Sequence, residues 1–174
     1  MQRELLARAI VETAQLKGSF ELRSGQISDT YFDKYRFEAD PALLVQIASQ
    51  MEPLLPKGTE VLAGLELGGV PVATALSLAT GLPQIFVRKA RKSYGTKRLA
   101  EGPEFTRKHI TIVEDIITTG GAVIDAVKEL RADGAEVSEV VCVILRQEET
   151  PEGLSDLGLN VTPLFRLSDL SLSD

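Results

Sequence analysis

The chain has few of the residues on which disulfides and several kinds of active site depend. Its 174 residues include one cysteine and one histidine. Cys142 cannot form an internal disulfide, and because it lies in the apolar run 140–145 we expect a core residue in a cytoplasmic protein. His109 is the only histidine, so histidine-based metal sites and catalysis by a serine–histidine–aspartate triad have little support.

Long apolar runs and an excess of positive charge are also missing. Without a long apolar run we expect no transmembrane helix, and Arg3, Glu4 and Arg8 in the first amphipathic segment do not fit a signal peptide. The formal net charge of -6 argues against general nucleic-acid binding. The remaining composition, 44% hydrophobic and 25% charged, is that of a globular protein, and the length predicts a single domain over residues 1–174.

The most informative stretch is a predicted strand followed by a polar loop and a helix. Residues 110–113 form a short β-branched run typical of a buried strand, and Glu114 and Asp115 follow at its predicted end. Thr-Thr-Gly-Gly occupies 118–121, and the apolar spacing over 123–130 predicts one face of a helix. The glycines and the helix N-terminus suit a phosphate, whereas the two carboxylates suit sugar hydroxyls or a nearby metal ion.

This stretch resembles the signature of the type I phosphoribosyltransferases, which bind phosphoribosyl pyrophosphate (PRPP). The shared pattern is an apolar run, two acidic residues, two apolar residues, Thr-Thr-Gly and a small residue; an ordinary strand–turn–helix with a polar turn is the alternative. The resemblance implies that residues 118–122 grip the 5'-phosphate, and that Glu114 and Asp115 are catalytic carboxylates that hold the ribose hydroxyls. The implied PRPP-binding residues in this stretch are Glu114, Asp115, Ile116, Ile117, Thr118, Thr119, Gly120, Gly121 and Ala122.

A basic segment stands out in this acidic chain. Residues 88–98 contain six basic residues and no acidic one. A charge run is often only a solvated loop, but beside an anion site it would suit closure over a polyanion. The segment resembles the family's catalytic loop, Arg-Lys-x-x-Lys-x-His-Gly, with Tyr94 in the usual His place. The resemblance implies that Arg88, Lys89, Lys92 and Tyr94 contact PRPP, that Lys89 is catalytic, and that a homodimer shares this loop across subunits.

A hairpin is predicted near the N-terminus. Phe20 and Leu22 alternate with polar residues, the pair 24–25 turns the chain, and Tyr31 and Phe32 begin a second strand. The hairpin is either an edge cover for the core or a lid over a substrate.

The same region carries a narrower resemblance. Phe-x-Leu-x-Ser-Gly-x-x-Ser, followed by an aromatic pair and Asp, resembles the N-terminal segment of orotate phosphoribosyltransferases, with Arg23 where Lys is usual. Arg146, in Arg-Gln-Glu after the predicted strand 137–145, matches the family's orotate-binding arginine, although a surface charge after a strand would look the same. The resemblance implies that Arg23, Thr118 and Arg146 bind orotate.

A second predicted strand–glycine loop–helix unit begins at residues 61–63. Its loop, 64–71, is not a Walker A loop, since Val70 and Pro71 stand where Lys and Ser or Thr are required. In the family this position matches the loop that approaches pyrophosphate, and some orotate enzymes have Lys where this chain has Gly68. The alternative is a glycine-rich turn that serves close packing.

Strands alternate with helices along the chain, which predicts an α/β fold with a mainly parallel sheet flanked by helices. The resemblance implies the type I phosphoribosyltransferase fold with a small N-terminal hood. Other predicted elements are a helix from Leu5 to near Gly18, a helix opening at Pro41, a strand over 84–87, a helix end near 133–134, a short helix after Glu152 and a strand near 161–165.

The implied reaction joins orotate to the ribose 5-phosphate group of PRPP, giving orotidine 5'-monophosphate and pyrophosphate in de novo pyrimidine biosynthesis. Mg²⁺ is the implied cofactor, carried by PRPP and water rather than by a protein metal site. Two alternatives stay open: a phosphoribosyltransferase for another base, and a non-catalytic PRPP-binding regulator of the same fold.

Overall fold

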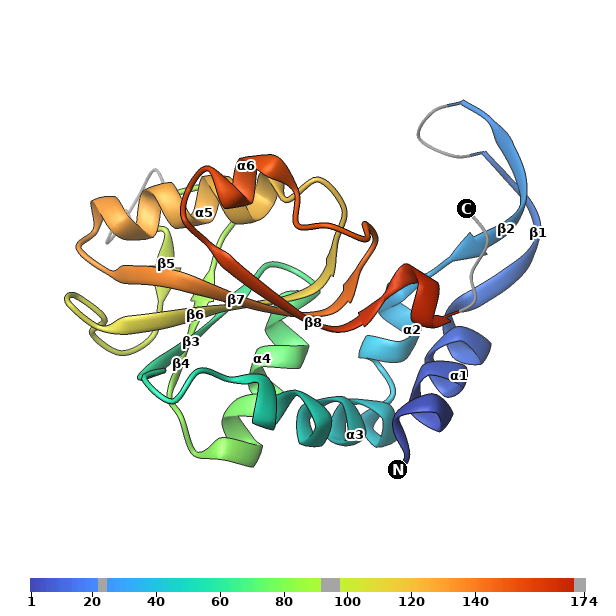
Figure 1. Cartoon of the computed structure of the whole chain (residues 1–174), viewed down its shortest axis with the longest axis horizontal. Helices are drawn as coiled ribbons and strands as arrows, with labels where there is room; N and C mark the ends of the chain where they lie inside the picture. The colour runs from blue at the N-terminus through green and yellow to red at the C-terminus, as the bar shows by residue number, and fades with distance from the viewer. Residues whose placement is uncertain (22–24, 92–97, 171–174) are drawn as a thin grey trace.

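A six-stranded sheet forms the centre of the computed structural model, which describes residues 1–21, 25–91 and 98–170 (Figure 1). The strand order is β5-β4-β3-β6-β7-β8, and all neighbouring pairs are parallel except β4 with β5. The strands are β3 (Val61–Leu65), β4 (Gln84–Val87), β5 (Ala100–Glu101), β6 (His109–Ile117), β7 (Glu136–Leu145) and β8 (Asn160–Arg166). The α/β class and the mainly parallel sheet are thus confirmed.

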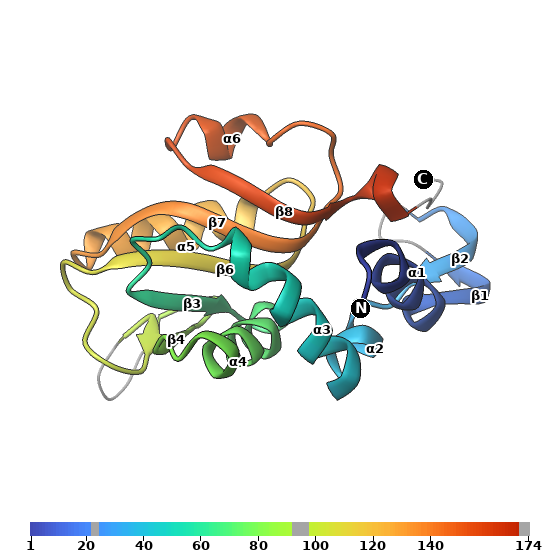
Figure 2. The same ribbon diagram turned by 60° about the horizontal axis from the view of Figure 1, so that its bottom comes forward.

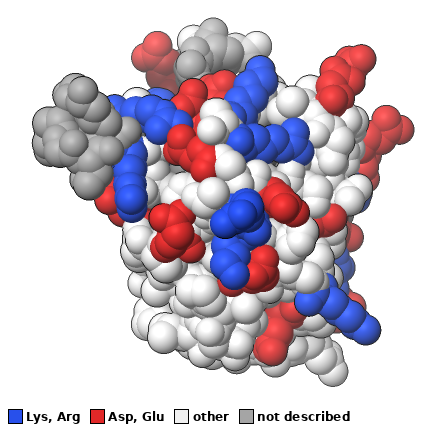
Figure 3. Space-filling view, turned by 90° about the vertical axis from the view of Figure 1, so that its left-hand side faces the viewer, with Lys and Arg blue, Asp and Glu red and all other residues white. Residues whose placement is uncertain are grey.

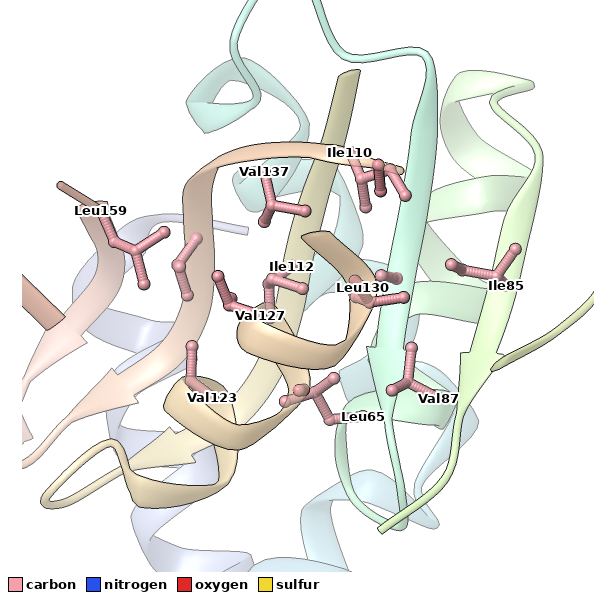
Figure 4. Close-up of a cluster of buried hydrophobic side chains, with 14 of the residues drawn as sticks. Leu65, Ile85, Val87, Ile110, Ile112, Val123, Val127, Leu130, Val137 and Leu159 are labelled. Carbon is pink, nitrogen blue, oxygen red and sulfur yellow. The ribbon is translucent and has the colours of Figure 1, made fainter. Parts of the chain in front are cut away.

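Helices cover both faces of this sheet (Figures 1 and 2). They are α1 (Arg3–Ala14), α2 (Lys34–Glu38), α3 (Pro41–Met51), α4 (Gly69–Thr80), α5 (Gly121–Ala132) and α6 (Glu152–Ser155), with 3₁₀ turns at Glu52–Leu54 and Leu167–Leu170. In Figure 4, Val123, Val127 and Leu130 of α5 pack over the sheet in one hydrophobic core, which also includes Ile112 of β6. A second core joins α1, α3 and α4 to the sheet, and the described helices include none long and apolar enough to cross a membrane.

A separate two-stranded hairpin, β1 (Gln15–Glu21) with β2 (Ile27–Phe32), projects beyond α1 (Figure 1). The predicted hairpin is confirmed, but two predicted boundaries were wrong, one in the hairpin and one at the end of the helix before it. Tyr31 and Phe32 end β2 rather than begin it, and the first helix ends at Ala14 rather than near Gly18. Leu16 pairs with Tyr31 in the hairpin, and the Ala14 carbonyl accepts a hydrogen bond of 2.8 Å from the Asp33 N–H. Strand pairing therefore overrides the helical spacing of the apolar residues here.

Several other predicted elements are confirmed, and their ends have clear local causes. α3 opens at Pro41, and the Asp40 carboxylate caps it by accepting hydrogen bonds of 2.8 and 3.1 Å from the N–H groups of Ala42 and Leu43. β4 spans the predicted residues, and α5 ends at Ala132, beside the predicted boundary.

The central strand is longer than predicted. β6 was expected over 110–113 with the acidic pair after it, but it pairs with β7 from His109 to Ile117. Glu114 and Asp115 are therefore strand residues. Two short elements, α2 and β5, were not predicted, because two to five residues are too few to show a periodic pattern.

Charge is mixed on the end of the molecule that faces the viewer in Figure 3. Lys and Arg side chains lie among Asp and Glu side chains over the described part of this face. A nucleic-acid-binding surface would instead show a patch of Lys and Arg side chains with few acidic ones among them.

Candidate active site

The connections of the sheet place a candidate site at the carboxyl ends of β3 and β6. From β3 the chain crosses through α4 to β4 on one side, and from β6 it crosses through α5 to β7 on the other side. Neighbouring strands whose connections diverge leave a crevice at their carboxyl ends, where α/β proteins bind ligands. The two loops that meet there follow Leu65 and Ile117.

The loop after β6 is open to solvent. Thr118, Thr119, Gly121 and Ala122 are exposed, and Gly120 has a left-handed φ of 78° just before α5 begins. Only glycine takes this conformation readily, and a Cβ on Gly120 would also lie 2.8 Å from side-chain atoms of Leu154. Within the described chain no side chain caps α5, so its first N–H groups are free to bind an anion.

Behind this loop lies a buried group of charged side chains. Asp115 has no exposed surface, and its Oδ2 is 2.6 Å from the Nζ of Lys34 on α2. The other carboxylate oxygen, Oδ1, accepts a hydrogen bond of 2.5 Å from the N–H of Ile116. Glu114 Oε2 is buried and has no hydrogen-bond partner among the residues that the structure describes. Burial, with the charge of Asp115 adding to it, raises the pKa of Glu114 well above its usual value.

Glu38, the last residue of α2, completes this group. It is 4% exposed, and burial raises its pKa to about 9, with a hydrogen bond to Asp115 and the charge of that carboxylate adding to the shift. The ammonium group of Lys34 acts in the opposite direction. With this raised pKa Glu38 carries a proton at neutral pH, so it does not repel Asp115 as a second carboxylate would. Sequence reasoning missed Lys34 and Glu38, because α2 is too short to show a helical pattern and an i,i+4 pair does not indicate what its side chains contact.

The loop after β3 packs directly against the acidic pair. A Cβ on Gly68 would lie 1.7 Å from Asp115 Oδ2, and a Cβ on Gly69 would lie 2.4 Å from the Val113 carbonyl oxygen and 2.7 Å from Glu114 Oε2. Any side chain at position 68 would therefore require Asp115 to move.

The start of the basic segment lies beside the same loop. The backbone N–H of Lys89 donates a hydrogen bond of 2.7 Å to Glu66 Oε1, so Lys89 is tied to the residues that follow β3. Arg88 Nε lies 3.5 Å from Glu101 Oε1, and Arg91 forms ion pairs with Glu129 and Asp133 of α5. The predicted PRPP contacts Lys92 and Tyr94 lie outside the described residues.

Arg146 lies beside the phosphate-type loop. Its backbone N–H donates a hydrogen bond of 2.9 Å to the carbonyl of Ile117, one residue before Thr118, and its side chain is exposed. The guanidinium group of Arg166 on β8 donates to the carbonyls of Gln147 and Glu148 and so holds the turn after Arg146. Arg23, the other predicted orotate contact, lies outside the described residues.

The structure thus brings together most of the predicted site. Glu114 and Asp115 lie on β6, which leads into the loop 118–122, and the Arg146 backbone is bonded to the end of the same strand, whereas Lys89 is tied through its backbone N–H to Glu66 after β3. A buried acidic pair behind an exposed glycine loop at a topological switch point defines an α/β protein that binds a phosphorylated, hydroxyl-bearing ligand.

Comparison with known proteins gives the family. The phosphoribosyl transferase domain model matches residues 38–156, and the chain belongs to the phosphoribosyltransferase family. An orotate phosphoribosyltransferase of Nocardioides sp. is 53% identical over 165 residues, which cover 95% of this chain and 92% of that protein. One from Methanocella arvoryzae is 40% identical over 166 residues and covers 95% of each chain.

Solved structures of orotate phosphoribosyltransferases share the fold of this chain. An orotate phosphoribosyltransferase of Mycobacterium tuberculosis H37Rv, in complex with Fe(III) dicitrate, superimposes with a TM-score of 0.88 at 34% identity, covering 98% of this chain and 99% of that one. A structure of the same enzyme in complex with PRPP gives a TM-score of 0.83 at 31% identity, again covering 98% and 99%. The resemblance found in the sequence is therefore confirmed, including its narrower form.

Proposed function

We propose that the chain catalyses the transfer of the ribose 5-phosphate group of PRPP to orotate, in de novo pyrimidine biosynthesis. One observation carries the chemistry: β6, the strand that leads into the largely exposed loop 118–122 and the start of α5, also carries Glu114, whose buried Oε2 has no partner within the described chain. An anion site and a free hydroxyl acceptor are what a sugar phosphate requires. The choice of orotate rests on the relatives, which match 95% of the chain and carry that name.

The reaction needs no nucleophile from the protein. The bond from C1' to pyrophosphate breaks with its electron pair leaving on pyrophosphate, and a ring nitrogen of orotate forms the new bond to C1'. Residues 118–122 would bind the 5'-phosphate, Glu114 would accept hydrogen bonds from the ribose hydroxyls, and Asp115 behind it would favour the developing positive charge. Lys89 would neutralise the leaving pyrophosphate, and Arg146 would bind the orotate carboxylate.

Mg²⁺ is proposed to enter the site with PRPP. In the described chain no group of three or more His, Cys, Asp or Glu side chains could hold a metal ion, and Asp115 already pairs with Lys34. The residue suited to approach the ion is Glu114, which would do so through water or the ribose hydroxyls. When bound, the ion would reduce the negative charge of the diphosphate.

A homodimer in the cytoplasm is also proposed, with the basic segment 88–98 completing the partner's site. The large apolar side chains of Leu67 and Phe86, which lie near the base of this segment, are exposed and suit an interface. The test mixes Lys89→Ala subunits with Asp115→Asn subunits, each inactive alone. Sharing across subunits would restore about a quarter of wild-type activity, because half the dimers are mixed and each has one complete site. No recovery would mean that the segment serves its own subunit.

The experiment that tests the activity follows orotate by its ultraviolet absorbance in the presence of PRPP and Mg²⁺, with uracil and adenine as control bases. Loss of orotate alone is the expected result. Turnover of a control base instead would keep the family and change the substrate. PRPP binding by calorimetry without turnover of any base would favour the regulator.

A further inference from the structure

We propose that Lys34 is a positioning residue for this reaction: its ammonium group fixes the buried Asp115 carboxylate at the end of β6. The inference rests on the proposed function, in which that end faces the ribose. Lys34 belongs to none of the motifs in the sequence. It reaches the site from α2, the five-residue helix that links the hairpin to α3 (Figure 1).

The local structure of α2 places the Lys34 and Glu38 side chains beside Asp115. The Asp33 carboxylate caps the helix by accepting a hydrogen bond of 3.2 Å from the Tyr35 N–H. Lys34 is the first residue of the helix and Glu38 the last, so their i,i+4 spacing places both side chains on the same side. Lys34 Nζ lies 2.6 Å from Asp115 Oδ2, and a Cβ on Gly68 would lie 1.7 Å from the same oxygen and 2.8 Å from Glu38 Oε1, which places the Glu38 carboxyl group beside Asp115.

Besides Lys34 and Glu38, the backbone of Gly68 packs against the Asp115 carboxylate. The Gly68 backbone lies so near Asp115 Oδ2 that a Cβ there would come within 1.7 Å of it. Asp115 has no exposed surface, whereas the Lys34 side chain is one-third exposed and reaches in from the surface. The carboxylate therefore has one arrangement, set by Lys34, Glu38 and the backbone at Gly68.

Lys34 is the cation that lets three carboxyl groups share this buried space. Its ammonium group contacts Asp115 directly and attracts Glu38 and Glu114 more weakly. Without it the fully buried Asp115 carboxylate would lose its counter-ion, and a buried charge without a partner is strongly unfavourable. Loss of the Lys34 charge should therefore act on the reaction much as loss of the Asp115 charge does.

β6 offers a matched control at its other end. Lys108 Nζ lies 2.8 Å from Glu60 Oε1 in an ion pair at the surface whose two side chains are both partly exposed. Exposed pairs of this kind contribute little to stability, and this one is remote from the carboxyl ends of the strands. Lys108→Met removes the same side-chain charge as Lys34→Met without touching Asp115.

The test measures kcat and the KM for PRPP in Lys34→Met, Lys34→Arg and Lys108→Met. Lys34→Met should lower kcat about tenfold or more while the KM for PRPP changes less than about threefold, because the lost interaction acts on the transition state. Lys34→Arg keeps the charge and should recover most of the loss. Lys108→Met should match the wild type.

A double-mutant cycle then decides whether Lys34 acts through Asp115. In an Asp115→Asn background, Lys34→Met should change kcat less than about twofold, because the group that Lys34 holds is already gone. Multiplicative losses would overturn the proposal, as would a Lys34→Met kcat close to that of the wild type or an equal loss in Lys34→Arg. If Lys34→Met does not fold, Lys34→Gln replaces it in both backgrounds: a loss of kcat of the same size in the two would overturn the proposal.

Failure of the proposed function gives a different result. If the wild type transfers to another base and not to orotate, the same comparison is made with that base and tests Lys34 independently. If the wild type transfers to no base, the proposed function and the role of Lys34 both fail.

Discussion

Two strand–glycine loop–helix units leave neighbouring parallel strands, and their glycines have opposite surroundings. After β3, Gly68 has an ordinary helical conformation, with φ -68° and ψ -31°, yet its missing Cβ would collide with Asp115. After β6, Gly120 requires a left-handed φ, and the missing Cβ of Gly121 would have nothing within 4 Å. The first loop is closed against the protein at Gly68, whereas the second is open at Gly121, although Gly120 beside it packs against Leu154.

The difference shows what a glycine-rich motif does and does not indicate. Such a motif indicates that something approaches the backbone closely. In the loop after β3, what approaches Gly68 and Gly69 is the acidic pair of β6, which fits the close-packing alternative for that loop. In the loop after β6, the space beside Gly121 is unfilled, as a ligand site requires. The pyrophosphate role suggested for the first loop stays a prediction.

Gly68→Ala should have the largest effect on stability and activity, because it adds a side chain where the loop after β3 packs against Asp115. The new methyl group would displace the Asp115 carboxylate and lower the free energy of unfolding by about 3 kcal/mol, as overpacking of a tight site does. Activity of the folded protein should fall with it. Chemical denaturation and orotate turnover measure the two losses.

The control for this change is Gly58→Ala. Gly58 has no atom within 4 Å of its missing Cβ and lies outside the left-handed region. Its substitution should shift the free energy of unfolding by less than about 0.5 kcal/mol. Equal denaturation midpoints for the two variants would show that the loop after β3 is not closed in solution.

Asp115→Asn should have the second largest effect. It separates the packing of the Asp115 side chain from its negative charge. Asn keeps the shape that Gly68 packs against, so thermal unfolding should stay cooperative. The loss of negative charge should lower kcat about 100-fold, the scale of a lost electrostatic contact in a transition state. Asp156→Asn, at an exposed position after α6, is the control and should leave kcat unchanged. Near-wild-type turnover in Asp115→Asn would refute the role assigned to Asp115.

Glu38→Gln tests the buried charged group behind the closed loop, through the pH dependence of the free energy of unfolding. The raised pKa of Glu38, about 9, means that the folded protein keeps a proton that the unfolded chain releases near its ordinary value of 4.5. Stability from Glu38 is therefore complete below that ordinary pKa and is lost as pH rises toward the folded value. Gln does not titrate, so between about pH 5 and about pH 8 the wild type should lose on the order of 2 kcal/mol relative to Glu38→Gln.

Denaturation at the two pH values measures this difference. The neighbours Lys34, Glu114 and Asp115 are present in both proteins, so their own titration largely cancels from the comparison. A difference in unfolding free energy that does not change with pH would show that Glu38 is ionised in the folded protein.

The elements that were predictable from sequence are those with local causes. Asp40 and Pro41 mark the start of α3 by capping chemistry, and the apolar run 140–145 gives most of β7 through burial. The loop 118–122 was predictable because its glycines, hydroxyls and following helix are contiguous.

What could not be predicted depends on contacts between distant segments. α1 ends early because Leu16 pairs with Tyr31, and β6 extends through Glu114 and Asp115 because β7 pairs along its whole length. The Lys34–Asp115 pair joins a short helix to the central strand, and no spacing in the sequence relates the two. The part of the site that recurs as a motif was therefore visible, and the part that holds it in place was not.

Gly121→Ala should have the smallest effect on stability, and it tests the open loop. Gly121 is the first residue of α5, where Ala is a better helix former, so the free energy of unfolding should rise by about 0.5 kcal/mol. If the space beside Gly121 receives the 5'-phosphate, the added methyl group should raise the KM for PRPP a few-fold while kcat changes little. Denaturation and steady-state kinetics on the same preparation separate the two effects.

Gly120→Ala provides the contrast within the same loop. Its left-handed φ and the nearby Leu154 side chain oppose any Cβ, so this substitution should destabilise the protein where its neighbour stabilises it. A more stable Gly121→Ala protein with an unchanged KM for PRPP would mean that the open space is not where the phosphate binds. The glycines after β6 would then serve the turn alone, and the two loops would differ in what they pack against rather than in whether they bind substrate.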